Sequence, residues 1–596
     1  MGEVAALGAA FDAEFAKALS SLPLDRGTPG DSETALNHYR QSQRVQELVA
    51  YYGSKLPPYA SVQRILTCAD KLLQRGEHKL AKDACYTLAR DLKLHEQQDV
   101  QRMDSLSRLS YHAQACMGME TCEAALVLAS DPALKHPRTL AGLVGCLRRL
   151  QAVVVLVLPS EPLYWLALNG SVYMYGLTKR LLTSGFVHQM LPHLVFCVKA
   201  METHVVFSTP KYLPWRTQLY VSLCTAYFDV AAYDLARMVT QEGLDKIDSL
   251  ISLQKLDPVP ATPDVQDAYR TARATLSGLK LKLAVLSAPT DDPAAAAAGG
   301  GKGAAPAKGA PKGGAAPPVD ALPAGLEPFK GLIDEVGSLS PLFRLTALMD
   351  SLQAAGRRVV RHEPAIGVRK DMWELATRAA VPRVDALSGA LAAARGAREA
   401  AAAAAAAQAA AEGEGGEAEA PAEPAPPPDM ATPASELPLD LHKVLLCTAY
   451  NVEAHDVFAK VLEAAEARLA EGGEALGGAP ADGPSASALA CAVSMLKALH
   501  ALESTPGAET LRAMAGTMLR TCGAASRHLP DVLADASLVL YNTARPLLDG
   551  AYCRADKEAG LVTEILRCLH ACWEACELDD AVARGVVGMK LALLLE

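Results

Sequence analysis

Apolar residues along this chain recur every three or four positions within segments of helical length, and short turn signals separate those segments. Residues 158–239 carry the pattern most clearly, because the chain's few aromatic residues are densest there and are set at helical intervals. This spacing is typical of amphipathic helices, whereas the alternation that marks half-buried strands is lacking. The sequence therefore predicts an all-α protein.

A helix, a tight turn and a second helix recur along the chain, close to the 34-residue tetratricopeptide plan. The clearest copy has Ile65, Cys68, Ala69 and Leu72 on its first helix, then the turn Gly76-Glu77-His78, then Ala81, Cys85 and Leu88. Three weaker copies are Met174, Leu177, Thr178, Leu181, Gly185, Phe186, Val187, Met190, Leu194 and Cys197; Tyr220, Leu223, Cys224, Tyr227 and Ala236; and Ile565, Cys568, Leu569, Cys572 and Ala581. These copies predict a tetratricopeptide-like helical-hairpin array (an α-solenoid), with an irregular α-helical array as the alternative.

Changes in composition divide the chain. Stretches rich in Ala, Gly and Pro hold almost no large apolar residue, so they cannot bury enough surface to offset the entropy cost of ordering. Alanine propensity predicts a helix that leads into an acidic, proline-rich disordered segment before position 437. The predicted organisation is an N-terminal tail or helix at 1–31, a helical repeat block at 32–286, a disordered linker at 287–325, a helical segment at 326–395, a poly-alanine helix and disordered segment at 396–437, and a second repeat block at 438–596 with a disordered loop at 471–487.

Charge and cysteine usage exclude several classes of protein. The 596 residues carry a net charge of −10 and show no Lys/Arg stripe interleaved with exposed aromatics, so nucleic acid is not an expected partner. The 14 cysteines form no paired CxxC modules, and the amino terminus has acids where a signal peptide needs a basic region. The most apolar run, Leu150–Leu158, is too short to span a bilayer and follows Arg148 and Arg149. We therefore predict a cytoplasmic protein with reduced thiols and no membrane anchor.

No cluster of reactive side chains has the spacing of a catalytic or ligand-binding site. Cys568, Cys572 and Cys576 lie on one helix face near His570, but three such thiols span about 12 Å at 1.5 Å per residue. One tetrahedral Zn²⁺ could not take all three without a partner segment, so buried core cysteines are the better interpretation. The glycine-rich stretch around Lys302 lacks the GxxxxGK spacing of a phosphate loop. The sequence therefore predicts no catalytic, cofactor-binding or metal site, and no enzyme.

The remaining candidates fit structural roles. Trp165 and Trp215 are expected to pack in the core, with an exposed partner anchor as the alternative, and Trp215→Ala should then destabilise the first block by about 3–5 kcal/mol. His188 and His193 have no Cys, Asp or Glu at metal-ligand spacing and are expected to be packed surface or core residues. A solvated, salt-bridged surface is expected for the acidic residues that lie beside Arg237 and Lys246, namely Asp229, Asp234, Asp245 and Asp248. The linker lysines Lys302, Lys308 and Lys312 are also expected to be solvated. For these lysines, contact with an acidic surface such as a tubulin tail is the alternative.

A longer pattern carries a family resemblance. It comprises Leu158, Pro159, Glu161, Leu163, Trp165, Asn169, Gly170, Tyr173, Tyr175, Arg180, Leu181, Leu182, Tyr212, Leu213, Trp215, Arg216, Leu219, Tyr220, Cys224, Tyr227 and Asp229. Further matches follow in order: KLP at 55–57, KLAKDACY at 79–86, KIDSL at 246–250 and MDSLQAAGRRV at 349–359. Over most of 44–365 the chain thus resembles the amino-terminal region of the cilia- and flagella-associated protein 54 family.

The resemblance implies a non-enzymatic scaffold of the motile cilium or flagellum axoneme, in a projection on a central-pair microtubule, required for cilium assembly and motility. It implies other central-apparatus projection proteins as partners, with indirect contact to microtubules left open, and no nucleic acid, membrane or small-molecule substrate. The implied location is the cytoplasm, cytoskeleton and axoneme. The family is several times longer and this chain ends within an apolar helix, so we expect it to continue in a longer protein.

The alternative function is a cytoplasmic tetratricopeptide-like adaptor that binds peptide segments of partner proteins. The two functions differ in whether an inner groove carries clustered polar residues that could clamp a peptide. The sequence alone does not identify such a set.

Overall fold

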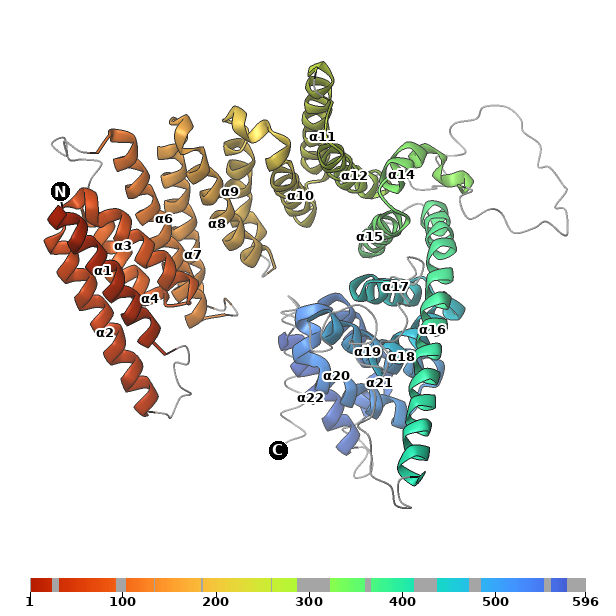
Figure 1. Ribbon diagram of the computed structural model, residues 1–596. Helices are drawn as coiled ribbons and strands as arrows, with labels where there is room; N and C mark the ends of the chain where they lie inside the picture. Colours follow the sequence, from red (N-terminus) through yellow and green to blue (C-terminus); the bar gives the residue numbers. More distant parts are fainter. Residues whose placement is uncertain are drawn as a thin grey trace. The chain divides into compact units, whose positions relative to one another are not determined.

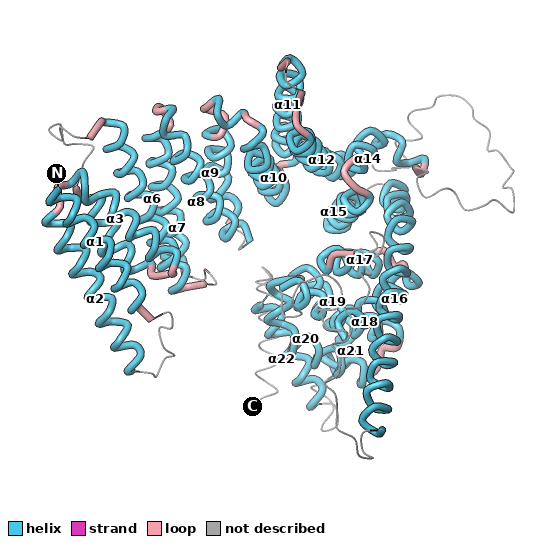
Figure 2. Tube along the Cα trace, in the orientation of Figure 1, coloured by secondary structure: helices cyan, strands magenta, loops and turns pink. Residues whose placement is uncertain are grey.

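The computed structural model describes residues 2–23, 32–92, 103–132, 134, 136–183, 186–258, 260–286, 322–359, 366–411, 437–470, 484–550 and 559–575. Every regular element within these ranges is a helix, and no strand occurs in them, as Figures 1 and 2 show. The prediction of an all-α helical array is therefore confirmed. The chain divides into two compact units, Met1–Leu283 and Ala284–Glu596.

The first unit is a succession of helical hairpins. Its helices are α1 (Gly2–Ser21), α2 (Ser32–Lys55), α3 (Pro58–Gln74), α4 (His78–Leu80), the π-helical segment η1 (Ala81–Tyr86), α5 (Thr87–Asp91), α6 (Ser105–Ser130), α7 (Pro137–Val157), α8 (Tyr164–Thr183), α9 (Val187–Ala200), α10 (Leu213–Asp229), α11 (Tyr233–Leu256) and α12 (Pro263–Leu286). Short 3₁₀ turns, η2 (Glu161–Leu163), η3 (Val205–Ser208) and η4 (Pro210–Tyr212), precede α8 and α10. The segments α4, η1 and α5 together form the second helix of the hairpin that α3 begins.

Helices of the first unit pack in two layers. Consecutive helices from α6 to α11 contact one another as antiparallel neighbours (Figure 1). Helices that are next but one along the chain also touch: α3 with α6 and α6 with α8 in one layer, and α7 with α9 in the other. This is how stacked hairpins bury a continuous core that no single hairpin could bury alone.

The apolar positions of the predicted hairpins face that core. The buried members are Ile65, Cys68, Ala69, Leu72, Ala81 and Cys85 in the first copy, Met174, Thr178, Leu181, Val187, Met190, Leu194 and Cys197 in the second, Tyr220, Leu223, Cys224 and Ala236 in the third, and Ile565, Cys568, Leu569 and Cys572 in the fourth. Ala581 of the fourth copy lies outside the described residues.

The turns between paired helices share one hydrogen-bond pattern. At the end of α3, Gly76 has a φ of 77°, and the backbone N–H of Glu77 donates to the carbonyl of Leu72 at 2.9 Å. The end of α10 repeats this arrangement, with Ala231 at a φ of 60° and a 2.9 Å bond from the N–H of Ala232 to the carbonyl of Tyr227. This is the Schellman motif, which satisfies the last carbonyls of a helix and reverses the chain.

The N-terminal segment takes part in the first unit's core. Phe11 and Phe15 of α1 are each 1% exposed, and the ring of Phe11 lies 5.1 Å from that of Tyr52 on α2. Because α1 also packs on α3, the part of 1–31 that the structure describes as helix belongs to the hairpin array.

The second unit contains η5 (Ala324–Phe329), α14 (Lys330–Gly337), α15 (Pro341–Val359), α16 (Ile366–Ala411), α17 (Leu439–Asn451), α18 (His455–Ala470), α19 (Pro484–Ser504), α20 (Ala508–His528), α21 (Pro530–Gly550) and α22 (Ala559–Ala575). Helix α17 contacts α18 and α19, while α20 contacts α19, α21 and α22. At the end of α17, Glu453 has a φ of 58°, and Ala454 N–H bonds the carbonyl of Ala449, so the hairpin turn of the first unit recurs here.

Three predicted boundaries differ from the structure. Helix α16 runs through position 395 because alanine favours continuing a helix. The segment η5 begins at Ala324, inside the predicted 287–325 linker, and α19 begins at Pro484, inside the predicted 471–487 loop. Proline is favoured in the first turn of a helix, where its missing N–H would have no helical partner. The predicted disordered stretches at 287–321, 412–436 and 471–483 lie outside the described residues.

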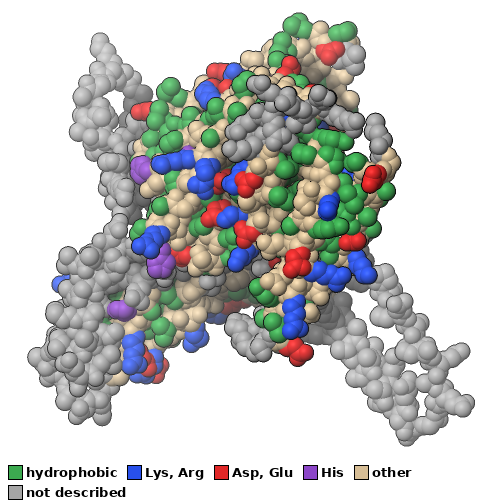
Figure 3. All heavy atoms as spheres, turned by 90° about the vertical axis from the view of Figure 1, so that its left-hand side faces the viewer, with side chains coloured by type: hydrophobic (Ala, Val, Ile, Leu, Met, Phe, Trp, Pro, Cys, Tyr) green, Lys and Arg blue, Asp and Glu red, His purple; other side chains and the backbone are tan. Residues whose placement is uncertain are grey.

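Surface charge is mixed on the face drawn in Figure 3. Lys and Arg side chains are interspersed there with Asp and Glu side chains and with exposed apolar groups. Mixed signs keep the electrostatic potential of such a face small at distances beyond a few ångströms.

A candidate protein-binding groove on stacked helices

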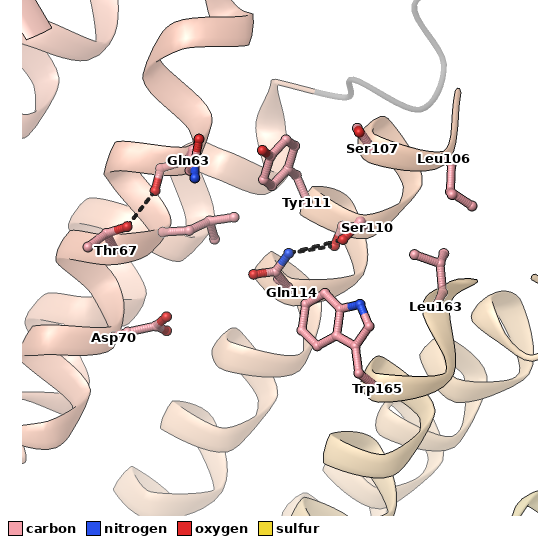
Figure 4. A pocket seen from close by; sticks show the side chains of 11 residues that line it. Gln63, Thr67, Asp70, Leu106, Ser107, Ser110, Tyr111, Gln114, Leu163 and Trp165 are labelled. Carbon is pink, nitrogen blue, oxygen red and sulfur yellow. Dashed lines mark hydrogen bonds between the residues drawn. The ribbon is translucent and has the colours of Figure 1, made fainter. Parts of the chain in front are cut away.

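An open groove of about 380 Å³ lies between α3, α6 and the start of α8. Its lining comprises Gln63, Leu66, Thr67, Asp70, Leu106, Ser107, Ser110, Tyr111, Gln114, Leu163 and Trp165. Figure 4 shows Asp70 reaching into this space from one wall and Gln114 and Trp165 from the other. The groove is formed by one layer of the array, because α3, α6 and α8 contact one another in sequence.

Helical spacing places the polar residues of each wall in a row. On α3, Gln63, Thr67 and Asp70 are four and three residues apart and share one exposed face. On α6, Ser107, Ser110 and Gln114 are three and four residues apart and share a half-buried face. The opposite faces of both helices are buried in the core, so burial of the apolar stripe is what turns the polar stripe toward the groove.

Much of the groove's hydrogen-bonding capacity is unused. Nε2 of Gln114 donates to Oγ of Ser110 at 3.1 Å, and the hydroxyl of Thr67 donates to the backbone carbonyl of Gln63 at 2.9 Å. Within the described part of the chain, the side-chain amide of Gln63, Nε1 of Trp165 and the hydroxyl of Tyr111 have no hydrogen-bond partner. The groove therefore offers both donors and acceptors to a molecule that enters it.

Asp70 is the one carboxylate in the lining. Its Oδ1 accepts a 2.7 Å hydrogen bond from the hydroxyl of Tyr86, a side chain that is 2% exposed. Burial, and then the bond to Asp70, raise the pKa of Tyr86, so the phenol stays a donor. Among the described residues, no lysine or arginine forms an ion pair with Asp70.

Tyr86 can take this position because α6 has a glycine beneath it. A Cβ at Gly118 would lie 2.2 Å from Cε1 of Tyr86, which is far inside van der Waals contact. Tyr86 is also the last residue of the π-helical segment, and such segments occur often at functional sites.

Polar and aromatic side chains also link α8 to α10, the next first helix of the array. Nε1 of Trp215 donates to Oγ of Ser171 at 3.0 Å, and the ring of Trp215 meets that of Tyr175 edge-on at 5.2 Å. Nε2 of Gln218 donates to the hydroxyl of Tyr175 at 2.9 Å. These bonds hold Trp215 and Tyr175 between α8 and α10, which are the first helices of two successive hairpins.

Both predicted tryptophans lie at the edge of the core. Trp165 and Trp215 pack against the main apolar cluster but are only partly buried. The prediction of core packing is therefore right in part. Trp165 also lines the groove, so the alternative of a partner anchor stays open for it.

The two predicted histidines differ. His188 is exposed. His193 is buried, and its Nδ1 lies 2.7 Å from Oε1 of Gln151, which links α9 to α7. Burial, and then the charge of Arg148, lower the pKa of His193, so it packs as a neutral side chain.

The predicted acidic face is a salt-bridged surface, but one of its residues, Asp248, pairs with a side chain other than the ones predicted. Asp234 pairs with Arg237 at 2.7 Å, and Oδ1 of Asp245 accepts from Gln241 at 2.8 Å. Asp248 pairs with Arg273 of α12, which lies 25 residues further along the chain, and not with Lys246 or Arg237. Spacing along one helix could not reveal this partner on another helix.

The thiols of the predicted metal-like cluster are core residues where the structure describes them. Cys568 and Cys572 are buried, with their sulfur atoms 3.9 Å apart. Cys576 and the Lys302 region lie outside the described residues. Within those residues, no group of three His, Cys, Asp or Glu side chains has the arrangement of a metal site.

Two described helices are long and apolar enough to cross a membrane, Pro137–Val157 and Ser485–Ser504. The apolar run Leu150–Leu158 lies at the end of the first of these, the 21-residue helix α7, which also contains Arg148 and Arg149. Such a helix is weak support for a membrane span, because core helices of many proteins have the same composition. Leu147, Leu150 and Val154 of α7 are indeed buried in the core of the array.

Apart from Trp165, no residue of the groove lining was a candidate from the sequence. The signal in the sequence was a row of uncharged polar residues on the first helix of a predicted hairpin, at 63 and 67, and another at 107, 110 and 114. Rows of this kind are also typical of a plain solvated face, so only the packing of α3 against α6 distinguishes them.

Comparisons with known proteins agree on one family. The model of a family described as "Cilia- and flagella-associated protein 54" matches residues 35–291. A protein of that name from Chlamydomonas reinhardtii is 38% identical, with an alignment that covers 100% of this chain and 23% of that protein. Proteins of the same name from Mus musculus and Homo sapiens are each 26% identical, over 42% and 39% of this chain and 8% of either protein.

A solved "Circular tandem repeat protein with novel repeat topology and enhanced subunit contact surfaces" covers 99% of this chain at 10% identity with a TM-score of 0.19, too low to support an argument about the fold. The chain spans about a quarter or less of the length of the curated relatives it matches. The similarity along the whole chain, together with the family match over the first helical block, shows that the chain belongs to the cilia- and flagella-associated protein 54 family.

Proposed function

We propose that this chain is a non-enzymatic structural scaffold of the motile cilium or flagellum axoneme. Its place is a projection on a central-pair microtubule, where it is required for cilium assembly and motility. Membership of the cilia- and flagella-associated protein 54 family supports the cilium as its location. The proposal extends from this region to the longer protein that the relatives represent.

The observation that carries the scaffold function is the open polar groove on the stacked first helices α3, α6 and α8. Helical-hairpin arrays present extended surfaces to other proteins. The groove is not enclosed, and its lining is mostly hydroxyl and amide groups, whereas sites for small molecules are mostly apolar and bury most of the ligand. The partners we propose are other projection proteins, with microtubule contact made through them.

The second candidate is a cytoplasmic adaptor that binds peptide segments, and the same groove favours it. The two functions predict different behaviour in the cell. A tagged full-length protein that contains this region would be followed through detergent extraction of isolated cilia. Retention with the axoneme, and tag density on one central microtubule by electron cryo-tomography, would support the scaffold; full release into the detergent fraction would contradict it and support the adaptor.

A further inference from the structure

We propose that the groove between α3, α6 and α8 binds an extended segment of a partner protein and places a lysine or arginine of that segment opposite Asp70. This inference rests on the proposed function in one respect, that the array acts by binding other proteins. It adds the conformation of the bound segment and the chemistry of the residue at its centre.

The shape and chemistry of the groove favour an extended chain. An extended segment leaves its backbone N–H and C=O groups unpaired, and each needs a partner once water is displaced. The groove supplies such partners in the free amide of Gln63, the free carbonyl oxygen of the Gln114 side chain and the hydroxyl of Tyr111. A bound helix would have its backbone groups satisfied internally and would gain little from this lining.

The charge of the groove favours a basic residue. Asp70 brings a negative charge to the lining, the lining contains no lysine or arginine, and no described basic residue pairs with Asp70. The bond from Tyr86 uses Oδ1 and limits the rotation of the carboxylate, which leaves Oδ2 available. Complementary charge of this kind selects partners and fixes their register more than it adds affinity.

Trp165 provides a second contact on the opposite wall. Its ring enters the groove from the start of α8, across from Asp70 (Figure 4). A chain that crosses from α3 to α8 would therefore meet the carboxylate, then the Gln114 amide, then an indole face. An indole suits either an apolar side chain or the stem of a long basic one.

The test uses the 596-residue chain and a phage-displayed library of random linear nonapeptides. We expect the enriched peptides to share a lysine or arginine at one position. In fluorescence anisotropy, Asp70→Asn should weaken binding of an enriched peptide about fivefold or more, the size of one charge-assisted contact. Replacing the shared basic residue by norleucine should cause the same loss, with no further loss when both changes are combined.

Two variants keep the result interpretable. Asp70→Asn retains an acceptor for Tyr86 and should keep the fold, and Asp83→Asn removes an exposed carboxylate outside the groove as a matched control. Asp70→Lys should shift the enriched residue from basic to acidic. The inference is overturned if no peptide is enriched, if enriched peptides lack a shared basic residue, or if Asp83→Asn weakens binding as much as Asp70→Asn.

The outcome is separable from the location experiment. Axonemal retention without a basic peptide motif would overturn this inference and leave the scaffold proposal standing. A basic motif with full release from the axoneme would support the groove and overturn the scaffold proposal.

Discussion

Tyr86 and Asp70 join the two helices of one hairpin through a 2.7 Å hydrogen bond from the phenol to the carboxylate. Tyr86 lies in the core on the second helix, and Asp70 lies on the exposed face of the first. The bond therefore connects the buried packing of the hairpin to the carboxylate of the groove. The close approach of Tyr86 to Gly118 extends this connection to α6.

Replacing Tyr86 with Phe should lower the local stability of the first hairpin by about 1 kcal/mol. The ring stays packed, and Asp70 is exposed enough for water to replace the missing hydrogen bond, so the cost is that of one net bond. Native-state hydrogen exchange of peptides that cover 58–91 would measure it. Tyr39→Phe is the control, because exposed Tyr39 only accepts a bond from Gln43; equal effects of the two changes would contradict the prediction.

The hairpin turns predict opposite effects for two substitutions. Gly76→Ala should destabilise the first unit by about 1 kcal/mol, because a φ of 77° is costly for a residue with a Cβ. Ala231→Gly should stabilise it by about 0.5–1 kcal/mol, because Ala231 already carries that cost at a φ of 60°. The fraction of the first unit folded across a urea series would show both shifts. A loss of stability in Ala231→Gly would show that this conformation is not strained.

Trp215→Ala should destabilise the first unit by about 2 kcal/mol, less than the value expected for a core residue from the sequence. Trp215 is only partly buried, so part of its ring already meets solvent. The substitution removes the hydrogen bond to Ser171 and the edge-on packing against Tyr175. Trp165→Ala in parallel should have a smaller effect on stability and a larger one on peptide binding, since Trp165 lines the groove. Reversed effects of the two changes would contradict these roles.

The second unit should lose stability between about pH 6.5 and pH 4. His442 is fully buried; burial lowers its pKa to about 4, with Arg468 adding to the shift and the bond from Nε2 to the carbonyl of Val461 opposing it. The unfolded state, with a pKa near 6.5, binds the proton first as pH falls. Stability is therefore complete above about pH 6.5 and decreases toward pH 4, by up to about 3 kcal/mol.

The free energy of unfolding of the second unit at pH 7 and pH 4.5 would measure this loss. His442→Gln should remove most of the difference between the two pH values, because glutamine does not titrate. His455→Gln, which changes an exposed histidine of the same unit, is the matched control. A pH difference that persists in His442→Gln would assign the loss to other groups.

The sequence by itself determined the helices and the family. The spacing of Ile65, Cys68, Ala69 and Leu72 specifies one apolar face, and all four are buried where the helix was predicted. Such local periodicity is sufficient because burial of one stripe stabilises a helix regardless of which neighbour covers it. The family resemblance needed no structure either, since it rests on the order of residues along the chain.

Only the tertiary structure determined the groove. Gln63, Asp70, Gln114 and Trp165 come from three helices, and in the sequence the polar ones look like ordinary solvated positions. Helical periodicity specifies which residues share a face of one helix, but not which faces of different helices meet. That is decided by the turns and by close packing such as that of Tyr86 on Gly118, which set how one hairpin stacks on the next.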